Sequence, residues 1–240
     1  MNNLSNYKAV LFDKDGTLFS FDAAWSVFCD RMLEHLAPGD ETLKDKMAQT
    51  VGYQRASGSF IAGSLIVNAS ADEVNAAWAA LAPGHDLAQV DALARAETKA
   101  LPAVPLFDLS DVMGSLRQMG LKLGVATNDI EAGALSQLNA VNALALFDFV
   151  CGSDSGYGRK PGTGMVDAFC AQTGIKAAEV IFVGDSTHDI DCGVNAGVGL
   201  CVGVLTGPAT AEQLAETDAL VLPSVASLPG YLSEANGAAA

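Results

Sequence analysis

Two aspartates, Asp13 and Asp15, stand two residues apart in the segment KAVLFDKDGTLFSFD, which spans residues 8–22. Side-chain carboxylates at such a spacing can bind a metal ion, attack an electrophile or exchange a proton with a substrate. An Asp-Gly pair such as Asp15-Gly16 is also a common structural turn. Other parts of the sequence are therefore needed to distinguish a catalytic or metal-binding role from a structural turn.

A calcium-binding loop of the EF-hand type fits this segment poorly. With Gly16 at the sixth position of the loop, the first position falls on Leu11, which has no side-chain oxygen, and the twelfth on Asp22 in place of the usual Glu. The residues before Asp13 are typical of a strand, whereas an EF-hand loop follows a helix. A calcium-binding module stays a distant alternative.

The composition excludes several classes of protein. The chain has 240 residues, of which 50% are hydrophobic, so it can bury the core of one large or two modest domains. Its 13 basic and 28 acidic residues give a formal charge of −15, which argues against nucleic acid or an anionic membrane as a partner. No apolar run approaches the length of a membrane-spanning helix. An anionic substrate would need a metal ion or a few local cations.

The cysteines and the N-terminus bear on location. The five cysteines are odd in number and widely spaced, with no Cys-x-x-Cys pair, which favours buried reduced thiols over a disulfide framework or a zinc site. The first residues lack the basic start and apolar stretch of a signal peptide. We therefore expect a cytoplasmic protein.

From about Pro105 onward, short apolar runs alternate with segments of helical periodicity. Continuously apolar strands alternating with helices are typical of a parallel sheet covered on both faces. The predicted strands lie within residues 9–12, 121–129, 147–154, 179–189 and 200–207. The predicted helices lie within residues 109–120, with Ser110 as N-cap, and within 130–147, 164–174, 191–198 and 210–219.

Residues 19–104 show helical periodicity and no convincing strand. Trp25 and Trp78 are expected in the core of this helical module. The predicted fold is therefore an α/β doubly wound parallel sheet, with a Rossmann-like core and an inserted all-α cap domain. The predicted division is 1–18 with 105–232 for the core, 19–104 for the cap and 233–240 for a disordered tail.

The polar residues that could carry chemistry follow the predicted strands. In a doubly wound sheet, ligands bind beyond the carboxyl ends of the strands, so residues at these ends should share one crevice. They are Asp13 and Asp15 after the first strand, Thr127 and Asn128 after the second, Lys160 after the third, and Asp185 and Asp189 after the fourth.

Such a crevice predicts a metal ion and a phosphate. Four carboxylates at close range repel one another, and an all-oxygen ligand set suits Mg²⁺, which retains water and shares phosphate oxygens. Lys160 and the Thr127 hydroxyl can donate to phosphate oxygens. Gly16 lets the backbone approach closely, and N–H groups in its turn could add further donors.

The segments DKDGT, TN, KP and GDSTHD occur in the order and places of the four motifs of the haloacid dehalogenase-like hydrolases, which this chain resembles. The insertion after the first motif is similar to that of members with a helical cap, of the phosphoglycolate phosphatase type. The resemblance implies that Asp13 attacks phosphorus to form an aspartyl-phosphate and that Asp15 protonates the leaving oxygen and later activates water. The second Asp distinguishes phosphatases of this family from dehalogenases.

The resemblance also implies the metal and phosphate ligands. Thr127 and Lys160 would hold the phosphoryl oxygens. Mg²⁺ would bind the Asp13 carboxylate, the Asp15 carbonyl oxygen and Asp185, and Asp189 would complete or orient the metal shell.

The chain departs from the family pattern at two places. Lys14 stands between the two aspartates where an apolar residue is usual, and strand alternation predicts that it points away from the site. The sequence PGTGM after Lys160 is also unusual for the family, which affects the local loop more than the role of Lys160.

The expected reaction is hydrolysis of a small phosphate monoester such as 2-phosphoglycolate. Gly16 and Asn128 are predicted to contact the substrate, and Arg55, the one cation of residues 52–68, to hold an anionic tail. Two alternatives remain: a phosphotransferase such as a sugar phosphomutase on the same scaffold, and a non-enzymatic phospho-receiver. The sequence leaves the oligomeric state open.

Overall fold

The computed structural model describes residues 6–61 and 63–237. The chain divides into two compact units, one formed by Met1–Ser20 with Pro105–Ala240 and the other by Phe21–Val104. The boundaries of independently folding domains stay a prediction. Each unit is described by itself below.

The first unit is built on a six-stranded sheet in which every neighbouring pair is parallel. Its strands are β1 (Ala9–Phe12), β4 (Lys122–Ala126), β5 (Phe149–Cys151), β6 (Val180–Gly184), β7 (Leu200–Val204) and β8 (Leu220–Leu222). The order β5-β4-β1-β6-β7-β8 places β1 between β4 and β6, so the direction of winding reverses at β1. This confirms the predicted doubly wound sheet and puts its switch point, the usual ligand position, at the end of β1.

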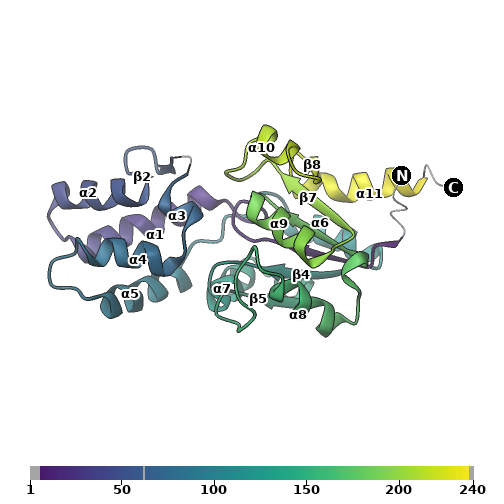
Figure 1. The fold of residues 1–240 in the computed structure, drawn as a ribbon, viewed down its shortest axis with the longest axis horizontal. Helices are drawn as coiled ribbons and strands as arrows, with labels where there is room; N and C mark the ends of the chain where they lie inside the picture. The colour runs from purple at the N-terminus through teal and green to yellow at the C-terminus, as the bar shows by residue number, and fades with distance from the viewer. Residues whose placement is uncertain (1–5, 62, 238–240) are drawn as a thin grey trace. The chain divides into compact units, whose positions relative to one another are not determined.

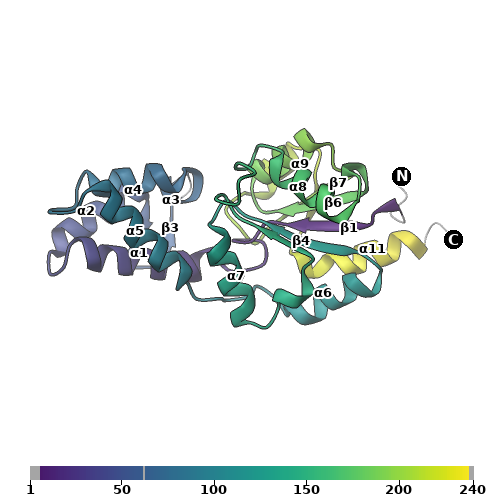
Figure 2. The same ribbon diagram turned by 90° about the horizontal axis from the view of Figure 1, so that it is seen from below.

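Helices cover both faces of this sheet. Figure 2 shows α8 (Gly164–Thr173) and α9 (Thr187–Ala196) on one face, and α6 (Leu109–Gln118), α7 (Glu131–Ala140) and α11 (Leu228–Gly237) on the other. The described part of this unit also contains α10 (Ala211–Ala215) and the short 3-10 helices η2 (Leu144–Leu146), η3 (Ala177–Glu179) and η4 (Val225–Ser227). All four residues of β1 and all five of β6 are buried, as central strands covered on both faces require.

Three local features of this unit differ from the sequence expectation. Helix α6 has Asp108 as its N-cap and not Ser110, because the Asp108 carboxylate accepts from the backbone N–H of Asp111 at 3.0 Å. Helix α7 stops at residue 140 and not near 147, and Asn142 then takes a positive φ of 56° that a helix cannot continue. Helix α11 continues to residue 237 where disorder was expected from 233; residues 238–240 lie outside the described part of the chain.

The second unit is mainly helical (Figure 1). Its helices are α1 (Phe21–Leu36), α2 (Glu41–Val51), α3 (Leu65–Asn68), α4 (Ala71–Ala79) and α5 (Leu87–Lys99). It is not all-α, because β2 (Tyr53–Gln54) and β3 (Ser59–Phe60) form a short antiparallel hairpin within the Gly/Ser-rich stretch. Trp78 is fully buried in its core and donates its indole N–H to the Met47 carbonyl at 3.2 Å.

Within the described ranges, 6–61 and 63–237, no helix has both the length and the apolar character needed to cross a membrane.

Candidate active site

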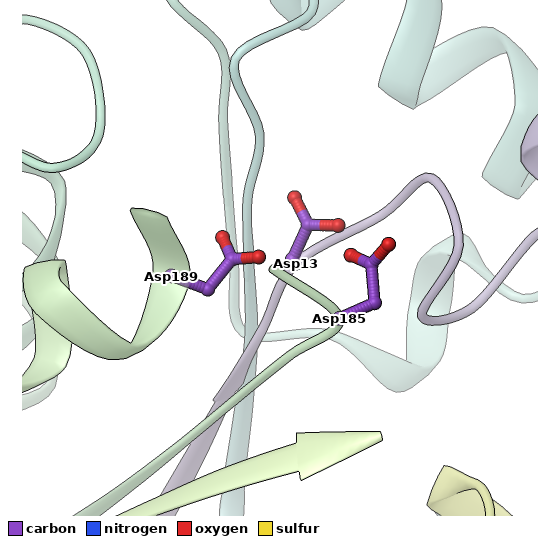
Figure 3. Close-up of side chains that lie close together, drawn as sticks. All are labelled: Asp13, Asp185 and Asp189. Atoms are coloured by element: carbon purple, nitrogen blue, oxygen red, sulfur yellow. The ribbon is translucent and has the colours of Figure 1, made fainter. Parts of the chain in front are cut away.

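Three aspartates meet beyond the carboxyl ends of β1 and β6. Figure 3 shows the side chains of Asp13, Asp185 and Asp189 turned toward one another. One carboxylate oxygen from each residue lies within 4.8 Å of the other two, and all three side chains are buried. The predicted convergence of these residues is therefore present in the structure.

Local hydrogen bonds fix two of these aspartates. The backbone N–H of Asp13 donates to the Val183 carbonyl at 2.8 Å, which extends the pairing of β1 with β6 to the site. Asp189 lies in the first turn of α9 and completes a capping box with Ser186: the Ser186 N–H donates to Asp189 Oδ2 at 3.1 Å, and the Asp189 N–H to Ser186 Oγ at 3.3 Å. A Cβ atom at Gly184 would lie 2.2 Å from that of Asp189, so only glycine allows this close approach of helix and strand.

Asp185 lies in a cradle formed by two glycines. A Cβ atom on Gly16 would lie 2.2 Å from Asp185 Oδ2, and one on Gly207 would lie 1.6 Å from the same oxygen. Gly16 also has a φ of +82°, a backbone conformation that residues other than glycine rarely adopt. Thr17 donates its hydroxyl to Asp185 Oδ1 at 3.2 Å. Thr17 belongs to the DKDGT motif, but the sequence alone gave it no role.

Lys160 supplies the positive charge in direct contact with this cluster. Its Nζ donates to Asp13 Oδ1 and lies 2.7 Å from Asp189 Oδ1, and its side chain is buried. Asn128 fixes the backbone of Lys160 on both sides: the Lys160 N–H donates to Asn128 Oδ1 at 2.9 Å, and Asn128 Nδ2 donates to the Lys160 carbonyl at 3.1 Å. The Asn128 amide therefore holds the loop that carries the lysine, and its predicted contact with substrate stays a prediction.

Burial and mutual repulsion perturb these carboxyl groups. Burial, together with the nearby Asp189 charge, raises the pKa of Asp13 to about 6, although Lys160 opposes the shift. Burial and the charges of Asp13 and Asp189 raise the pKa of Asp185 well above its usual value. Burial acts to lower the pKa of Lys160, but the two contacting carboxylates outweigh it and the pKa is raised. The cluster of three carboxylates thus has less positive charge than it needs, because Lys160 contributes only one unit.

The donor set fits a hard divalent cation. The three converging atoms are carboxylate oxygens, which Mg²⁺ prefers, and a divalent ion would supply the counter-charge that one lysine does not. Asp13 Oδ1 and Asp189 Oδ1 are engaged by Lys160, and Asp189 Oδ2 by Ser186. Asp13 and Asp185 are therefore the better placed direct ligands, with Asp189 holding the lysine beside them.

Two other predicted residues of the phosphate site have partners of their own. Thr127 is buried, and its Oγ1 accepts from the Asp129 N–H at 3.1 Å, which leaves the hydroxyl proton for another acceptor. The Gly16 N–H donates to the Phe19 carbonyl at 2.7 Å, so it is used within its turn. The absence of a side chain at Gly16 leaves space for the Asp185 carboxylate. The predicted contact of Gly16 with substrate stays a prediction.

Strand alternation predicts that Lys14 points away from the site, and this prediction is wrong, because the Lys14 side chain contacts Asp15. The alternation fails because β1 ends at Phe12 and the chain turns: the Lys14 carbonyl accepts from the Leu18 N–H at 2.8 Å and from the Phe19 N–H at 3.0 Å. The Lys14 side chain is fully buried, and its Nζ lies 2.7 Å from Asp15 Oδ2.

Sequence reasoning missed two partners of Lys14. Its Nζ donates to Gln137 Oε1 at 2.6 Å and lies 3.1 Å from Asp129 Oδ2. Burial raises the pKa of Asp129, against the opposing effect of Lys14. The available signal was Lys14 itself, since a lysine at a position usually apolar must find buried polar partners.

Arg55 belongs to the second unit. Its Nη2 lies 2.7 Å from Glu41 Oε2, and its Nη1 donates to Asp45 Oδ1. Both ends of the guanidinium fork are thus occupied by carboxylates within that unit. The predicted grip on a substrate tail stays a prediction.

The family assignment follows from this geometry and from comparison with known proteins. The model of the haloacid dehalogenase-like hydrolases matches residues 10–202, which include all four motifs, and the chain belongs to this family. Two curated relatives and one crystal structure illustrate the similarity.

Validoxylamine A 7′-phosphate phosphatase of Streptomyces hygroscopicus subsp. limoneus is 29% identical over 229 residues, which cover 90% of this chain and 93% of the relative. Phosphoglycolate phosphatase of Escherichia coli (strain K12) is 33% identical over 104 residues, covering 42% of this chain and 41% of that protein. The crystal structure of a predicted phosphoglycolate phosphatase from Haemophilus somnus 129PT superimposes with a TM-score of 0.70 at 18% identity, covering 94% of this chain and 98% of the other. The last similarity supports the fold alone, and the curated relatives support a phosphatase.

Proposed function

We propose that this protein is a Mg²⁺-dependent phosphatase that hydrolyses a small phosphate monoester through an aspartyl-phosphate on Asp13. The observation that carries the proposal is the contact of Asp13 with Lys160 beside Asp185 and Asp189. This arrangement gives a buried carboxylate nucleophile, a cation against its repulsion from phosphate, and oxygen ligands for a metal ion in one place.

In the first step, an oxygen of Asp13 attacks phosphorus and the ester P–O bond breaks. Asp15 gives its proton to the leaving oxygen, so the alcohol departs neutral. In the second step, water gives a proton to Asp15 and attacks the phosphorus of the aspartyl-phosphate. The acyl P–O bond breaks, which regenerates the Asp13 carboxylate and releases inorganic phosphate.

Lys160 and Thr127 assist both steps by charge and hydrogen bonding. Lys160 contacts Asp13 and offsets the repulsion between its carboxylate and the phosphoryl oxygens. Thr127 keeps a hydroxyl proton for a phosphoryl oxygen. A Mg²⁺ ion held by Asp13, Asp185 and the Asp15 carbonyl would polarise the phosphoryl group and orient it for in-line attack.

The relatives suggest two substrate classes. One curated relative is named for phosphoglycolate, a small phosphorylated acid, and matches less than half of this chain. The other is named for validoxylamine A 7′-phosphate and matches nearly all of it. We keep 2-phosphoglycolate as the leading candidate for an anionic substrate, and we expect a cytoplasmic enzyme.

The proposal is tested by phosphate release from a panel of monoesters with Mg²⁺. The panel includes 2-phosphoglycolate, sugar phosphates, validoxylamine A 7′-phosphate and p-nitrophenyl phosphate, each with and without an acceptor sugar. Turnover with release of inorganic phosphate supports hydrolysis, whereas transfer to the sugar at the expense of release supports the phosphotransferase alternative. A protein that becomes phosphorylated once and does not turn over is a phospho-receiver, which contradicts the proposal.

A further inference from the structure

Lys14 lies at the centre of a buried polar network beside the proposed site. Its ammonium donates to Asp15 Oδ1 at 2.8 Å and to Gln137 Oε1 at 2.6 Å. It lies 2.7 Å from Asp15 Oδ2 and 3.1 Å from Asp129 Oδ2, the latter as an ion pair without a hydrogen bond. Its side chain has no solvent-exposed surface.

Stability is a poor explanation for this lysine. Removing an ammonium from water is costly, and replacing a buried ion pair by apolar side chains of similar volume is often neutral or stabilising. An apolar residue at position 14 would need no buried partners. The network therefore suggests a contribution to function.

The geometry connects Lys14 to one catalytic candidate. Both oxygens of Asp15 are approached by the same ammonium, at 2.7 and 2.8 Å, which restricts rotation of the carboxyl group. On its other side, the ammonium is held by Gln137 on α7 and by Asp129 after β4. Asp129 is in turn fixed by the Ile130 N–H, which donates to its Oδ1 at 2.6 Å. The orientation of Asp15 is thus tied to a neighbouring strand and helix of the core unit.

We propose that Lys14, anchored by Asp129 and Gln137, is a positioning residue that orients the Asp15 carboxyl group for proton transfer to the leaving oxygen. This inference rests on the proposed function, in which Asp15 is the general acid. One oxygen of Asp15 keeps accepting from Lys14 while the other carries the proton to the leaving oxygen. Proton transfer depends strongly on alignment, so a loosened Asp15 should fail most where the leaving group needs its proton.

The test is Lys14→Met, which keeps much of the side-chain volume and removes the ammonium. The values of kcat/KM are measured for p-nitrophenyl phosphate and for the alkyl phosphate that the panel hydrolyses fastest. Because kcat/KM covers the steps up to departure of the leaving group, it isolates the acid role of Asp15 from its later role with water. The ratio of the two values in one preparation also does not depend on the fraction of folded enzyme.

We expect Lys14→Met to lower the ratio of alkyl to aryl kcat/KM by about tenfold or more, toward the value of Asp15→Asn. Adding Lys14→Met to Asp15→Asn should not change the ratio further, since Lys14 acts through Asp15. Lys8→Met is the matched control, because this lysine is 61% exposed and pairs with Glu179 away from the site. It should leave the ratio unchanged.

Gln137→Met is the second variant, needed in case Lys14→Met does not fold. It leaves the ammonium on Asp15 but removes one anchor, so the ratio should fall in the same direction by about threefold. A merely structural role predicts equal losses on both substrates and an unchanged ratio in every folded variant. That result, with the ratio shifted in Asp15→Asn, overturns the inference and leaves the phosphatase proposal standing. An unchanged ratio in Asp15→Asn itself removes the acid role and this inference with it.

Discussion

Asp13 and Asp185 follow a pair of residues that lie side by side in neighbouring strands. Phe12 of β1 is in register with Val183 of β6, so Asp13 comes one residue beyond this pair and Asp185 two residues beyond it. The register of the sheet, and not any local turn, therefore sets the separation of the two carboxylates. A metal ion between them would lie among buried carboxylates beyond the carboxyl ends of β1 and β6.

The first prediction concerns the metal. EDTA should abolish hydrolysis and added Mg²⁺ should restore it, because the buried carboxylates need a divalent counter-charge to coexist with a phosphate. Ca²⁺ should bind and inhibit, since its larger and more variable coordination shell misplaces Asp13 relative to phosphorus. Initial rates with each ion in turn provide the measurement. Full activity in chelator would contradict the metal assignment.

The second prediction concerns pH and the stability of the chelated protein. Burial raises the pKa of Asp13 from 3.8 to about 6, and the pKa of Asp185 is raised well above 3.8. The folded state therefore binds these protons more tightly than the unfolded state, so their contribution to stability is present below about pH 4 and is lost as pH rises through about 6. Mg²⁺ should restore stability at neutral pH by replacing the protons.

The Asp185→Asn variant isolates this effect, because it removes one of the competing charges and keeps an oxygen for the Thr17 hydroxyl. Urea unfolding in EDTA is compared for variant and wild type at about pH 5 and about pH 7.5. The variant should gain stability relative to wild type at the higher pH and should lose the stabilisation by Mg²⁺. Parallel pH profiles for the two proteins would show that Asp185 does not carry a raised pKa.

The third prediction concerns substrate choice. If Arg55 holds an anionic tail, Arg55→Ala raises KM for 2-phosphoglycolate and leaves p-nitrophenyl phosphate nearly unchanged. The structure sets a condition on this role, since Arg55 must leave Glu41 or Asp45 to bind a substrate carboxylate. Arg31→Ala, which removes an exposed arginine paired with Glu97 in the same unit, is the control. Equal effects on both substrates would make Arg55 a surface residue.

The sequence predicted the sheet and most of the site because each relied on a strong local pattern. Apolar runs identified β1 and β6, and Asp13, Asp185 and Asp189 beyond these strands lie close together with Lys160. The prediction was wrong where tertiary contacts override local pattern. Lys14 turns into a buried network that depends on Gln137, which lies 123 residues further along the chain.

The smaller differences have similar causes. Asp108 rather than Ser110 caps α6, and a positive φ at Asn142 ends the helical stretch that periodicity extended to residue 147. The hairpin of β2 and β3 was missed because two-residue strands leave almost no alternation to detect. The cradle around Asp185 depends on Gly207. Sequence patterns did not predict that the two residues lie close together, because they are far apart along the chain.

The most direct test of the central claim is the rate of phosphate release by Asp13→Asn with Mg²⁺ and the best substrate of the panel. The substitution keeps the shape of the side chain but removes the attacking carboxylate, so hydrolysis should fall to near background while thermal unfolding remains cooperative. Asp111→Asn, an exposed aspartate in the first turn of α6, should keep wild-type activity. Activity of Asp13→Asn within about tenfold of wild type, equal to roughly 1.4 kcal/mol in the barrier, would contradict nucleophilic attack by Asp13.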